Sequence, residues 1–137
     1  MTMTSDEQRR IEREVLGILD DLIRGCEQSD MDLAFGMFSR GPEFRMIAGD
    51  GTLCAFAEYY DSNVAYLRTC LAFALTTHAA DVLVLDSEHA VLTWTYEVKA
   101  THADGTTDVI PRAGATFVFE KRVGSWTVVR YHESSGV

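Results

Sequence analysis

Apolar residues recur at intervals of three and four along the first half of the chain, which predicts helices. The first helix is expected over residues 5–26, where one face is apolar and the opposite face is charged. A shorter helix is expected after Asp30 and should end before the Gly41-Pro42 pair. A third is expected over residues 52–73. The segment 44–48, between the second and third helices, predicts a short strand.

From His78 onward the pattern changes to alternation and to β-branched and aromatic residues, which predicts strands. We expect these strands at residues 82–85, 89–100, 112–123 and 126–133. Short Gly-containing turns separate the last three, so they should form antiparallel hairpins. Helices and strands that are segregated along the chain predict an α+β fold.

One sheet has to cover three helices that all carry apolar stripes. A strongly curved antiparallel sheet wrapped around the three N-terminal helices does this, and it leaves a concave face that the helices only partly fill. We therefore expect a pocket at the open end of the sheet. The length of 137 residues fits one domain over residues 1–137, with no linker or internal repeat.

The composition narrows the range of partners. The chain has 12 Lys and Arg against 21 Asp and Glu, a net charge of −9. This charge disfavours nucleic acid and anionic membranes. No apolar run is long enough to span a membrane, and the N-terminus lacks the apolar core of a signal peptide. The expected location is cytoplasmic.

Cysteine and histidine spacing gives no sign of a metal site. Cys26, Cys54 and Cys70 are odd in number, form no CxxC pair and lie in apolar surroundings, so we expect buried free thiols. The histidines show no HxH or HxxxH spacing. We expect neither a metal nor an organic cofactor. The four histidines are His78, His89, His102 and His132.

Four segments carry a resemblance to a known family: AVLTWTY at 90–96, ATFVFEK at 115–121, GSWTVV at 124–129 and YHES at 131–134. Together they resemble the nuclear transport factor 2-like (cystatin-like) superfamily, a cone-shaped α+β fold, and within it the SnoaL-like proteins. The tail 129–136 is also similar to the association domain of calcium/calmodulin-dependent protein kinase II. The superfamily includes isomerases, dehydratases, polyketide cyclases, epoxide hydrolases and non-enzymatic adaptors, so the resemblance implies a fold rather than one activity.

Side chains of a strand alternate between its two faces, so counting along each strand predicts what lines the pocket. The apolar faces of strands 89–100 and 112–123 should point inward. The family resemblance places the His132 face of the last strand inward as well. The predicted lining residues are Trp94, Tyr96, Phe117, Phe119, Arg130 and His132, with Tyr59 or Tyr60 from the third helix.

The candidate chemistry depends on these inward polar groups. In an apolar cavity His132 would stay neutral and could act with Tyr96 as general acid or base. Arg130 could bind a ligand carboxylate, and Tyr59 or Tyr60 could donate a hydrogen bond to a substrate oxygen. The structural alternatives are a histidine satisfied by the backbone, an arginine held in an ion pair and tyrosines that only pack.

No carboxylate falls on an inward strand position in this count. Glu97, Glu120 and Glu133 all take the opposite parity, which leaves Glu58 and Asp61 of the third helix as substitutes. A steroid-isomerase-like or cyclase-like mechanism needs an inward carboxylate base. An Arg-Asp pair that could activate water is likewise not evident.

The outward positions of the sheet are β-branched or aromatic and largely uncharged, which is unusual for a face exposed to water. A two-fold homodimer through this face would cover it, and sheet-to-sheet dimers are common in the family that the chain resembles. The outward set comprises Thr93, Thr95, Thr116, Val118, Thr127, Val129 and Tyr131.

Three functions fit the pattern. The first is a protein that binds a small, mostly hydrophobic ligand, which could carry a carboxylate, and acts as an isomerase- or lyase-type enzyme through His132. The second is a non-catalytic binding or oligomerisation module whose sheet surface is the working part. The third is a polyketide-cyclase-type enzyme with a large hydrophobic substrate, which requires a carboxylate such as Asp61 inside the pocket.

Overall fold

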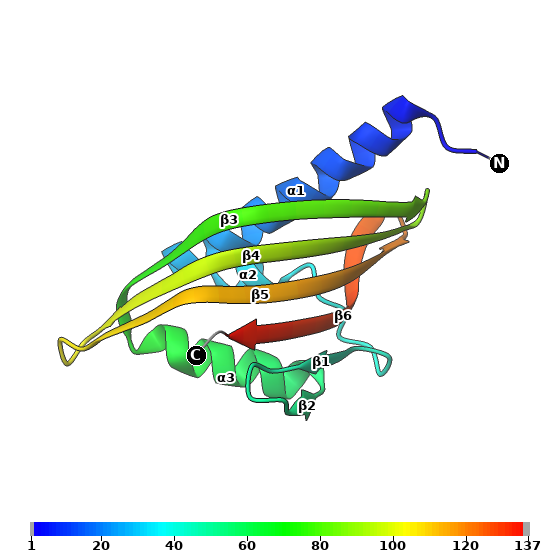
Figure 1. Ribbon diagram of the computed structural model, residues 1–137. Coiled ribbons are helices and arrows are strands. Elements are labelled where there is room, and N and C mark those ends of the chain that lie inside the picture. The colour runs from blue at the N-terminus through cyan, green and yellow to red at the C-terminus, as the bar shows by residue number, and fades with distance from the viewer. Residues whose placement is uncertain (1, 136–137) are drawn as a thin grey trace.

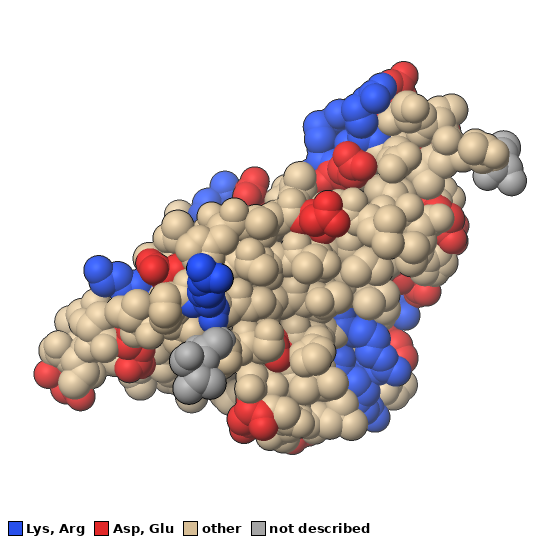
Figure 2. All heavy atoms as spheres, in the orientation of Figure 1, with Lys and Arg blue, Asp and Glu red and all other residues tan. Residues whose placement is uncertain are grey.

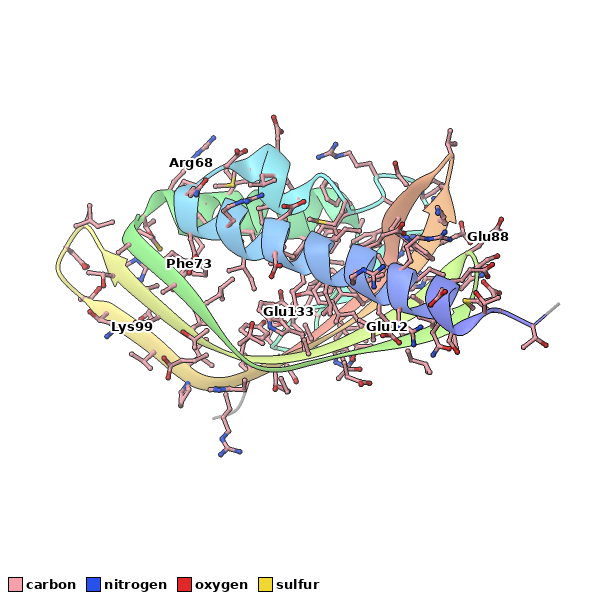
Figure 3. All side chains as sticks on the ribbon, turned by 90° about the horizontal axis from the view of Figure 1, so that it is seen from above. Glu12, Arg68, Phe73, Glu88, Lys99 and Glu133 are labelled. Atoms are coloured by element: carbon pink, nitrogen blue, oxygen red, sulfur yellow. The ribbon has the colours of Figure 1, made fainter. Side chains whose placement is uncertain are left out.

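The computed structural model describes residues 2–135 and confirms the α+β fold, with three helices on one side of a curved six-stranded sheet (Figures 1 and 3). The strand order across the sheet is β2-β1-β6-β5-β4-β3. The elements are α1 (Ser5–Gln28), α2 (Met31–Phe35), β1 (Arg45–Ile47), β2 (Leu53–Cys54), α3 (Phe56–Arg68), β3 (Cys70–Asp86), β4 (His89–His102), β5 (Thr107–Arg122) and β6 (Ser125–Ser135).

Helix α1 crosses the concave face of the sheet and buries one apolar stripe there. Thr4 caps its first turn, because its hydroxyl accepts a hydrogen bond from the backbone N–H of Glu7 at 3.1 Å. Near its end, Gly25 lies against Ala34 of α2. A side chain at position 25 would come within 2.3 Å of the Ala34 nitrogen, so this helix contact requires glycine.

The sheet is antiparallel except at one pair of strands. Strand β6 lies between β5, its antiparallel partner, and β1, with which it runs parallel. The expectation of a purely antiparallel sheet is therefore wrong at this pair. Strand β1 precedes α3, and the chain returns to it only with its last strand, so no tight hairpin can join the two.

The predicted third helix is too long at both ends. Leu53 and Cys54 pair with β1 as strand β2, and α3 begins only at Phe56. The helix ends at Arg68, where the Thr69 hydroxyl donates to the Tyr66 carbonyl at 2.7 Å. Residues 70–73, the last part of the predicted helix, instead belong to β3 and pair along β4. Long-range strand pairing overrides a local pattern that fits either structure.

Five register shifts interrupt the pairing of β3 to β6, and three of them lie within the sheet rather than at the ends of β3. The pairing of β3 with β4 shifts at His78, and β5 holds two residues, Pro111 and Arg112, opposite one residue of β4. On β6, Val128 pairs with Phe119 and Arg130 pairs with Val118, which leaves Val129 without a partner. Each is a β-bulge, which increases local twist and bends the strand.

The core lies between α1 and the concave face and is rich in aromatic rings. Phe35, Phe38 and Phe44 come from the segment around α2 and β1, and Phe38 meets the other two rings and that of Phe117 on β5. The largest fully buried side chains are Trp94, Phe35, Phe44, Phe117, Phe119, Ile11, Met46, Leu92, Val15 and Val128.

Candidate functional site

A cavity of about 230 Å³ lies inside the open end of the sheet, between α1, α3 and strands β3 to β6. Its walls are mainly apolar or aromatic, with Phe73 and Leu75 of β3 on one side. Figure 3 shows Phe73 and Glu133 on the side of the sheet that faces the helices. Three buried tyrosines and a glutamate form the cavity cluster, which we define as Tyr59, Tyr96, Tyr131 and Glu133. The other polar lining residues are Cys26, Asn63, Tyr66, Ser134 and Ser135.

The bulge at Val129 decides which residues of β6 reach this cavity. Before the bulge, Trp126 and Val128 point inward, as simple alternation predicts. The extra residue reverses the count, so Tyr131 and Glu133 point inward after it. The sequence prediction placed these two residues outside.

The same reversal corrects the predicted positions of His132 and Arg130. Both side chains are exposed on the outer face of the sheet, and neither lines the cavity. The prediction that they form the polar groups of the pocket is wrong. His132 therefore cannot act with Tyr96 on one small ligand, because the sheet lies between their side chains.

Glu133 is the carboxylate that the sequence count did not find. Its Oε1 accepts a hydrogen bond from the Tyr131 hydroxyl at 2.8 Å. Among residues 2–135, no Lys, Arg or His forms an ion pair with it. Burial raises the pKa of Glu133, and the bond from Tyr131 opposes only part of that shift. A carboxyl group in this position exchanges protons nearer to neutral pH than an exposed one does.

The three tyrosines supply hydroxyl groups that stay protonated. Burial raises the pKa of Tyr59, Tyr96 and Tyr131, and the negative charge of Glu133 adds to the effect on all three. Tyr59 and Tyr131 are each 5% exposed and their rings lie 5.5 Å apart. Tyr96 stacks on Trp94 at 3.7 Å, and the Trp94 indole N–H donates to the Thr77 hydroxyl at 2.9 Å. These contacts fix the rings whether or not a ligand is bound.

Several predicted lining residues have other places. Trp94, Tyr96 and Tyr59 line the cavity, but Phe117 and Phe119 are core residues that stack on each other beneath it. Tyr60 lies outside the cavity lining and stacks on Phe56 at 5.6 Å.

The proposed substitutes for an inward carboxylate are also misplaced. Glu58 and Asp61 are both exposed on the outer side of α3. Glu58 instead accepts the backbone N–H of Ala55 and so caps the start of the helix. Neither can serve as a base inside the cavity.

A thiol completes the cavity wall. Cys26 of α1 is 7% exposed and lines the cavity, and burial raises its pKa to about 12. It is therefore a neutral, poorly nucleophilic group. All three cysteines are free, and Cys26 is the buried one.

A second polar cluster lies at the mouth of the cavity, where α3 meets the β4–β5 hairpin. The His102 Nε2 lies 2.7 Å from Asp108 Oδ2, which also accepts the Tyr66 hydroxyl at 2.8 Å. The His102 Nδ1 lies 2.9 Å from the Thr69 hydroxyl. The bond to Asp108 raises the pKa of His102 and lowers that of Asp108. Tyr66 also lines the cavity, so this cluster holds one of its mouth residues in place.

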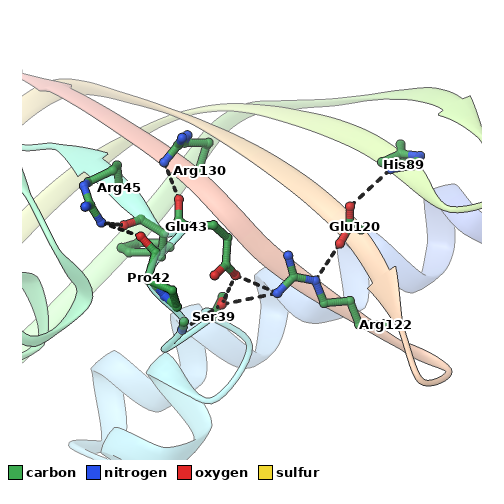
Figure 4. A network of polar contacts seen from close by, with 10 residues as sticks. Ser39, Pro42, Glu43, Arg45, His89, Glu120, Arg122 and Arg130 are labelled. Carbon is green, nitrogen blue, oxygen red and sulfur yellow. Dashed lines mark hydrogen bonds and ion pairs between the residues drawn. The ribbon is translucent and has the colours of Figure 1, made fainter.

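A third cluster, the loop network, ties the segment after α2 to strand β5 (Figure 4). Glu43 Oε1 accepts hydrogen bonds from the Ser39 hydroxyl at 2.5 Å and from Arg122 at 2.6 Å. Arg122 also binds Glu120 at 2.6 Å, and Glu120 lies 3.4 Å from His89. The bonds from Ser39 and Arg122 lower the pKa of Glu43 to about 2.

The described residues contain no group of three or more His, Cys, Asp or Glu side chains placed to hold a metal ion. Within the same residues, no helix is long and apolar enough to cross a membrane.

Comparison with known proteins places the chain in a family. The sequence profile of the SnoaL-like domain matches residues 15–137. The chain belongs to the SnoaL-like domain family. A search of curated protein sequences finds no significant match.

Solved structures with this fold resemble the SnoaL-like chain over nearly its whole length. A nuclear transport factor 2-like superfamily protein from Salmonella enterica is 18% identical with a TM-score of 0.82, over 95% of this chain and 94% of that one. A candidate scytalone dehydratase from Novosphingobium aromaticivorans is 8% identical with a TM-score of 0.84, over 98% and 89%. The association domain of CaMKII from C. elegans is 13% identical with a TM-score of 0.72, over 96% and 99%. At these identities the likeness concerns the fold.

Proposed function

We propose that this SnoaL-like protein binds a small, mostly apolar ligand in the cavity and acts on it as a lyase- or isomerase-type enzyme, with Glu133 as general base. The observation that carries the proposal is an unpaired carboxylate inside an aromatic cavity. A structural carboxylate is usually exposed or paired with a cation. Glu133 has neither arrangement, and its raised pKa suits it to take a proton from a bound substrate.

Each member of the cavity cluster has a role in this proposal. Glu133 removes a proton from a carbon next to a carbonyl or a leaving group. Tyr59 and Tyr96 donate hydrogen bonds to the oxygen on which negative charge develops. Tyr131 positions the carboxylate through its hydrogen bond. The candidate dehydratase with this fold is named for an elimination reaction, which is the same class of chemistry.

The cavity favours this reading over a cyclase-type enzyme for large substrates. A volume of about 230 Å³ holds a ligand of one or two rings rather than a long polyketide. His132, the general acid or base expected from the sequence, has no role in this mechanism because its side chain is exposed on the outer face of the sheet.

Base-catalysed opening of 5-nitrobenzisoxazole tests the role of Glu133 without knowledge of the natural substrate. In this reaction a base takes the proton on C3, the ring N–O bond breaks, and a coloured cyanophenolate forms. We expect turnover by the wild-type protein that rises with pH through the raised pKa of Glu133. The variant Glu133→Gln should lose at least about 100-fold in rate.

The matched control is Glu97→Gln, which changes a half-buried glutamate on the outer face of the same sheet. Its rate should equal that of the wild-type protein. Equal turnover by Glu133→Gln would contradict the proposal. Binding of the probe to the wild-type protein without turnover would leave a ligand-binding protein and would contradict the enzymatic part.

A homodimer through the sheet is the second part of the proposal. Figure 2 looks onto the outer face of the sheet, where charged atoms lie mostly near the margins and the central strip is largely uncharged. Thr93 and Thr95 are exposed there, with Leu83 57% exposed beside them. A second copy would cover this strip. The association domain of CaMKII, which is named for assembly, has the same fold.

Light scattering after size-exclusion chromatography measures the mass that decides this part. We expect twice the chain mass of 15.3 kDa for the wild-type protein. Thr93→Arg should give monomers, because a two-fold axis brings two like charges into one apolar interface. Thr107→Arg, at the exposed tip of the β4–β5 hairpin, is the control and should remain a dimer. A monomeric wild-type protein would rule out the dimer.

A further inference from the structure

The outer face of the sheet carries a groove that is separate from the cavity. It lies where β1 and β2 join β6, has a volume of about 380 Å³, and includes Arg45, Arg130 and His132. Its apolar part comes from Ile47, Leu53, Val118 and neighbouring atoms of Met46. We refer to this site as the outer groove.

Two arginines lie next to each other in this groove without a carboxylate between them. Arg45 and Arg130 are register partners in the parallel pairing of β1 with β6. Like charges on neighbouring strand positions repel each other. Among residues 2–135, the ion pairs that involve arginine use Arg9, Arg10, Arg24 and Arg122, and none uses these two.

The backbone, rather than an acid, holds the two guanidinium groups. Arg45 donates to the carbonyls of Pro42 and Phe44 at 2.8 and 2.6 Å, and Arg130 donates to the carbonyl of Glu43 (Figure 4). All these bonds use a single Nη1 atom of each arginine. The remaining N–H groups stay available, and the anchored side chains lose less entropy when they bind an anion.

His132 adds a third donor at the same place. It follows Arg130 by two positions on β6, is exposed, and is the register partner of Ile47. The chain as a whole has a net charge of −9. Two arginines and a histidine grouped in one groove therefore differ from the rest of its surface. Around them, Leu53 is 64% exposed, so the groove offers an uncovered apolar surface beside its charges.

We propose that the outer groove is a second binding site, for a small organic acid whose carboxylate lies between Arg45 and Arg130 and whose apolar body rests on Ile47, Val118 and Leu53. Arginine and carboxylate match in geometry, since two parallel N–H groups meet two oxygens. The cavity suits such a ligand less, because a carboxylate there would meet the carboxyl group of Glu133. The site does not depend on the proposed enzymatic role of that cavity.

Titration with 4-phenylbutyrate, followed by calorimetry and by the methyl NMR signals of the protein, tests the proposal. The neutral 4-phenylbutanol is the matched probe without a charge. We expect the acid to bind more tightly than the alcohol, with shifts at the methyl groups of Ile47 and Val118. Added salt should weaken the binding of the acid.

The variant Arg45→Gln/Arg130→Gln should raise the dissociation constant of the acid by about tenfold or more. Arg13→Gln, an exposed arginine on α1, removes one charge elsewhere and should leave binding unchanged. The single variants Arg45→Gln and Arg130→Gln should each weaken binding, and they serve as the test if the double variant does not fold.

Three results would overturn the proposal. One is equal binding of the acid and the alcohol by the wild-type protein. Another is a set of methyl shifts confined to the cavity. The third combines two measurements: the double variant becomes monomeric, and the wild-type protein shows no preference for the acid. Together they would mean that the arginines form a contact between two copies of the chain.

Discussion

Glu43 and Glu133 are two partly buried glutamates of one small domain with opposite electrostatic surroundings. Glu43 accepts hydrogen bonds from Ser39 and Arg122, and its pKa falls to about 2. Glu133 has one phenol partner and no cation among the described residues, and its pKa rises. The first arrangement holds a loop in place, whereas the second keeps a reactive group in a cavity. Burial without a cation raises the pKa of Glu133, whereas hydrogen bonds lower that of Glu43, and this difference separates a chemical role from a structural one.

Insertion of one alanine between Arg130 and Tyr131 should have the largest effect on this contrast. With one more residue after the bulge, regular alternation would turn Tyr131 and Glu133 to the outer face and expose a large aromatic ring. We expect a loss of about 3 kcal/mol or more in the free energy of unfolding, comparable with removal of a core aromatic side chain. Urea unfolding measures it.

Val129→Ala keeps the length of β6 and is the control for this insertion. It should cost much less stability and should preserve the cavity. An insertion variant as stable as the wild-type protein would show that alternation along β6 does not determine the inward position of Glu133.

The variant Glu133→Gln should raise stability while it removes the proposed activity. Because the folded pKa of Glu133 is raised, the folded state holds a proton that the unfolded state releases. Unfolding free energy should therefore fall in the wild-type protein as pH rises from about 4.5 through the raised folded pKa. The variant should lack this fall and gain about 1 kcal/mol at pH 8.

Urea unfolding as a function of pH checks this prediction, with Glu97→Gln as the reference. A Glu133→Gln variant that is less stable than the wild-type protein at pH 8 would mean that the carboxylate is stabilised by partners. In that case the contrast with Glu43 would not hold.

The other half of the contrast concerns the loop network. The folded pKa of Glu43 is lowered, so its stabilising effect is present above pH 4.5 and is lost as pH falls toward about 2. Arg122→Gln should raise the pKa of Glu43, and Ser39→Ala should raise it at least as much, because the Ser39 bond is the larger cause.

Carbon NMR titration of the glutamate carboxyl groups measures both shifts. In Arg122→Gln the pKa of Glu120 should rise together with that of Glu43, since Arg122 lowers the pKa of both. In Ser39→Ala the pKa of Glu120 should stay unchanged. An unaltered Glu43 titration in both variants would contradict the hydrogen-bond explanation.

The smallest expected effect concerns His102 at the cavity mouth. Its folded pKa is raised above 6.5, chiefly by the bond to Asp108. This contribution to stability is full below pH 6.5 and is lost as pH rises through the folded value. Asp108→Asn should lower the pKa of His102 toward 6.5 in an imidazole NMR titration. Asp104→Asn should lower it by less, because Asp104 is a minor cause.

The sequence predicted the architecture well because the large signals are local. The apolar stripe of the first helix and the hairpin turns after residue 100 each leave a clear periodicity, and the structure confirms the α+β fold with its curved sheet. The helix predicted up to Phe73 failed where the same residues also suit a strand. Their pairing with β4 decides the outcome, and a local window does not contain that information.

The site was predicted less well because alternation holds only while pairing is regular. Trp94, Tyr96 and Tyr59 were placed correctly, on elements without an irregularity between them and the cavity. The predicted faces of His132 and Glu133 were reversed, because Val129 is an unpaired extra residue between them and the start of β6. Its side chain is like those of its neighbours, so its residue type does not mark it as a bulge. The available signal was the mixture of polar and apolar residues on both predicted faces of β6, which regular alternation does not explain.

The place of β6 in the sheet also has a consequence for biosynthesis. This last strand is not an edge but lies between β5 and β1, which is about 85 residues earlier in the chain. A nascent chain that has emerged only as far as Gly124 holds β1 without its neighbour, and it exposes the apolar side of α1 together with an open edge of β5. Completion of this domain therefore waits until β6 has left the ribosome, and until then the chain exposes apolar surface of the kind that chaperones bind.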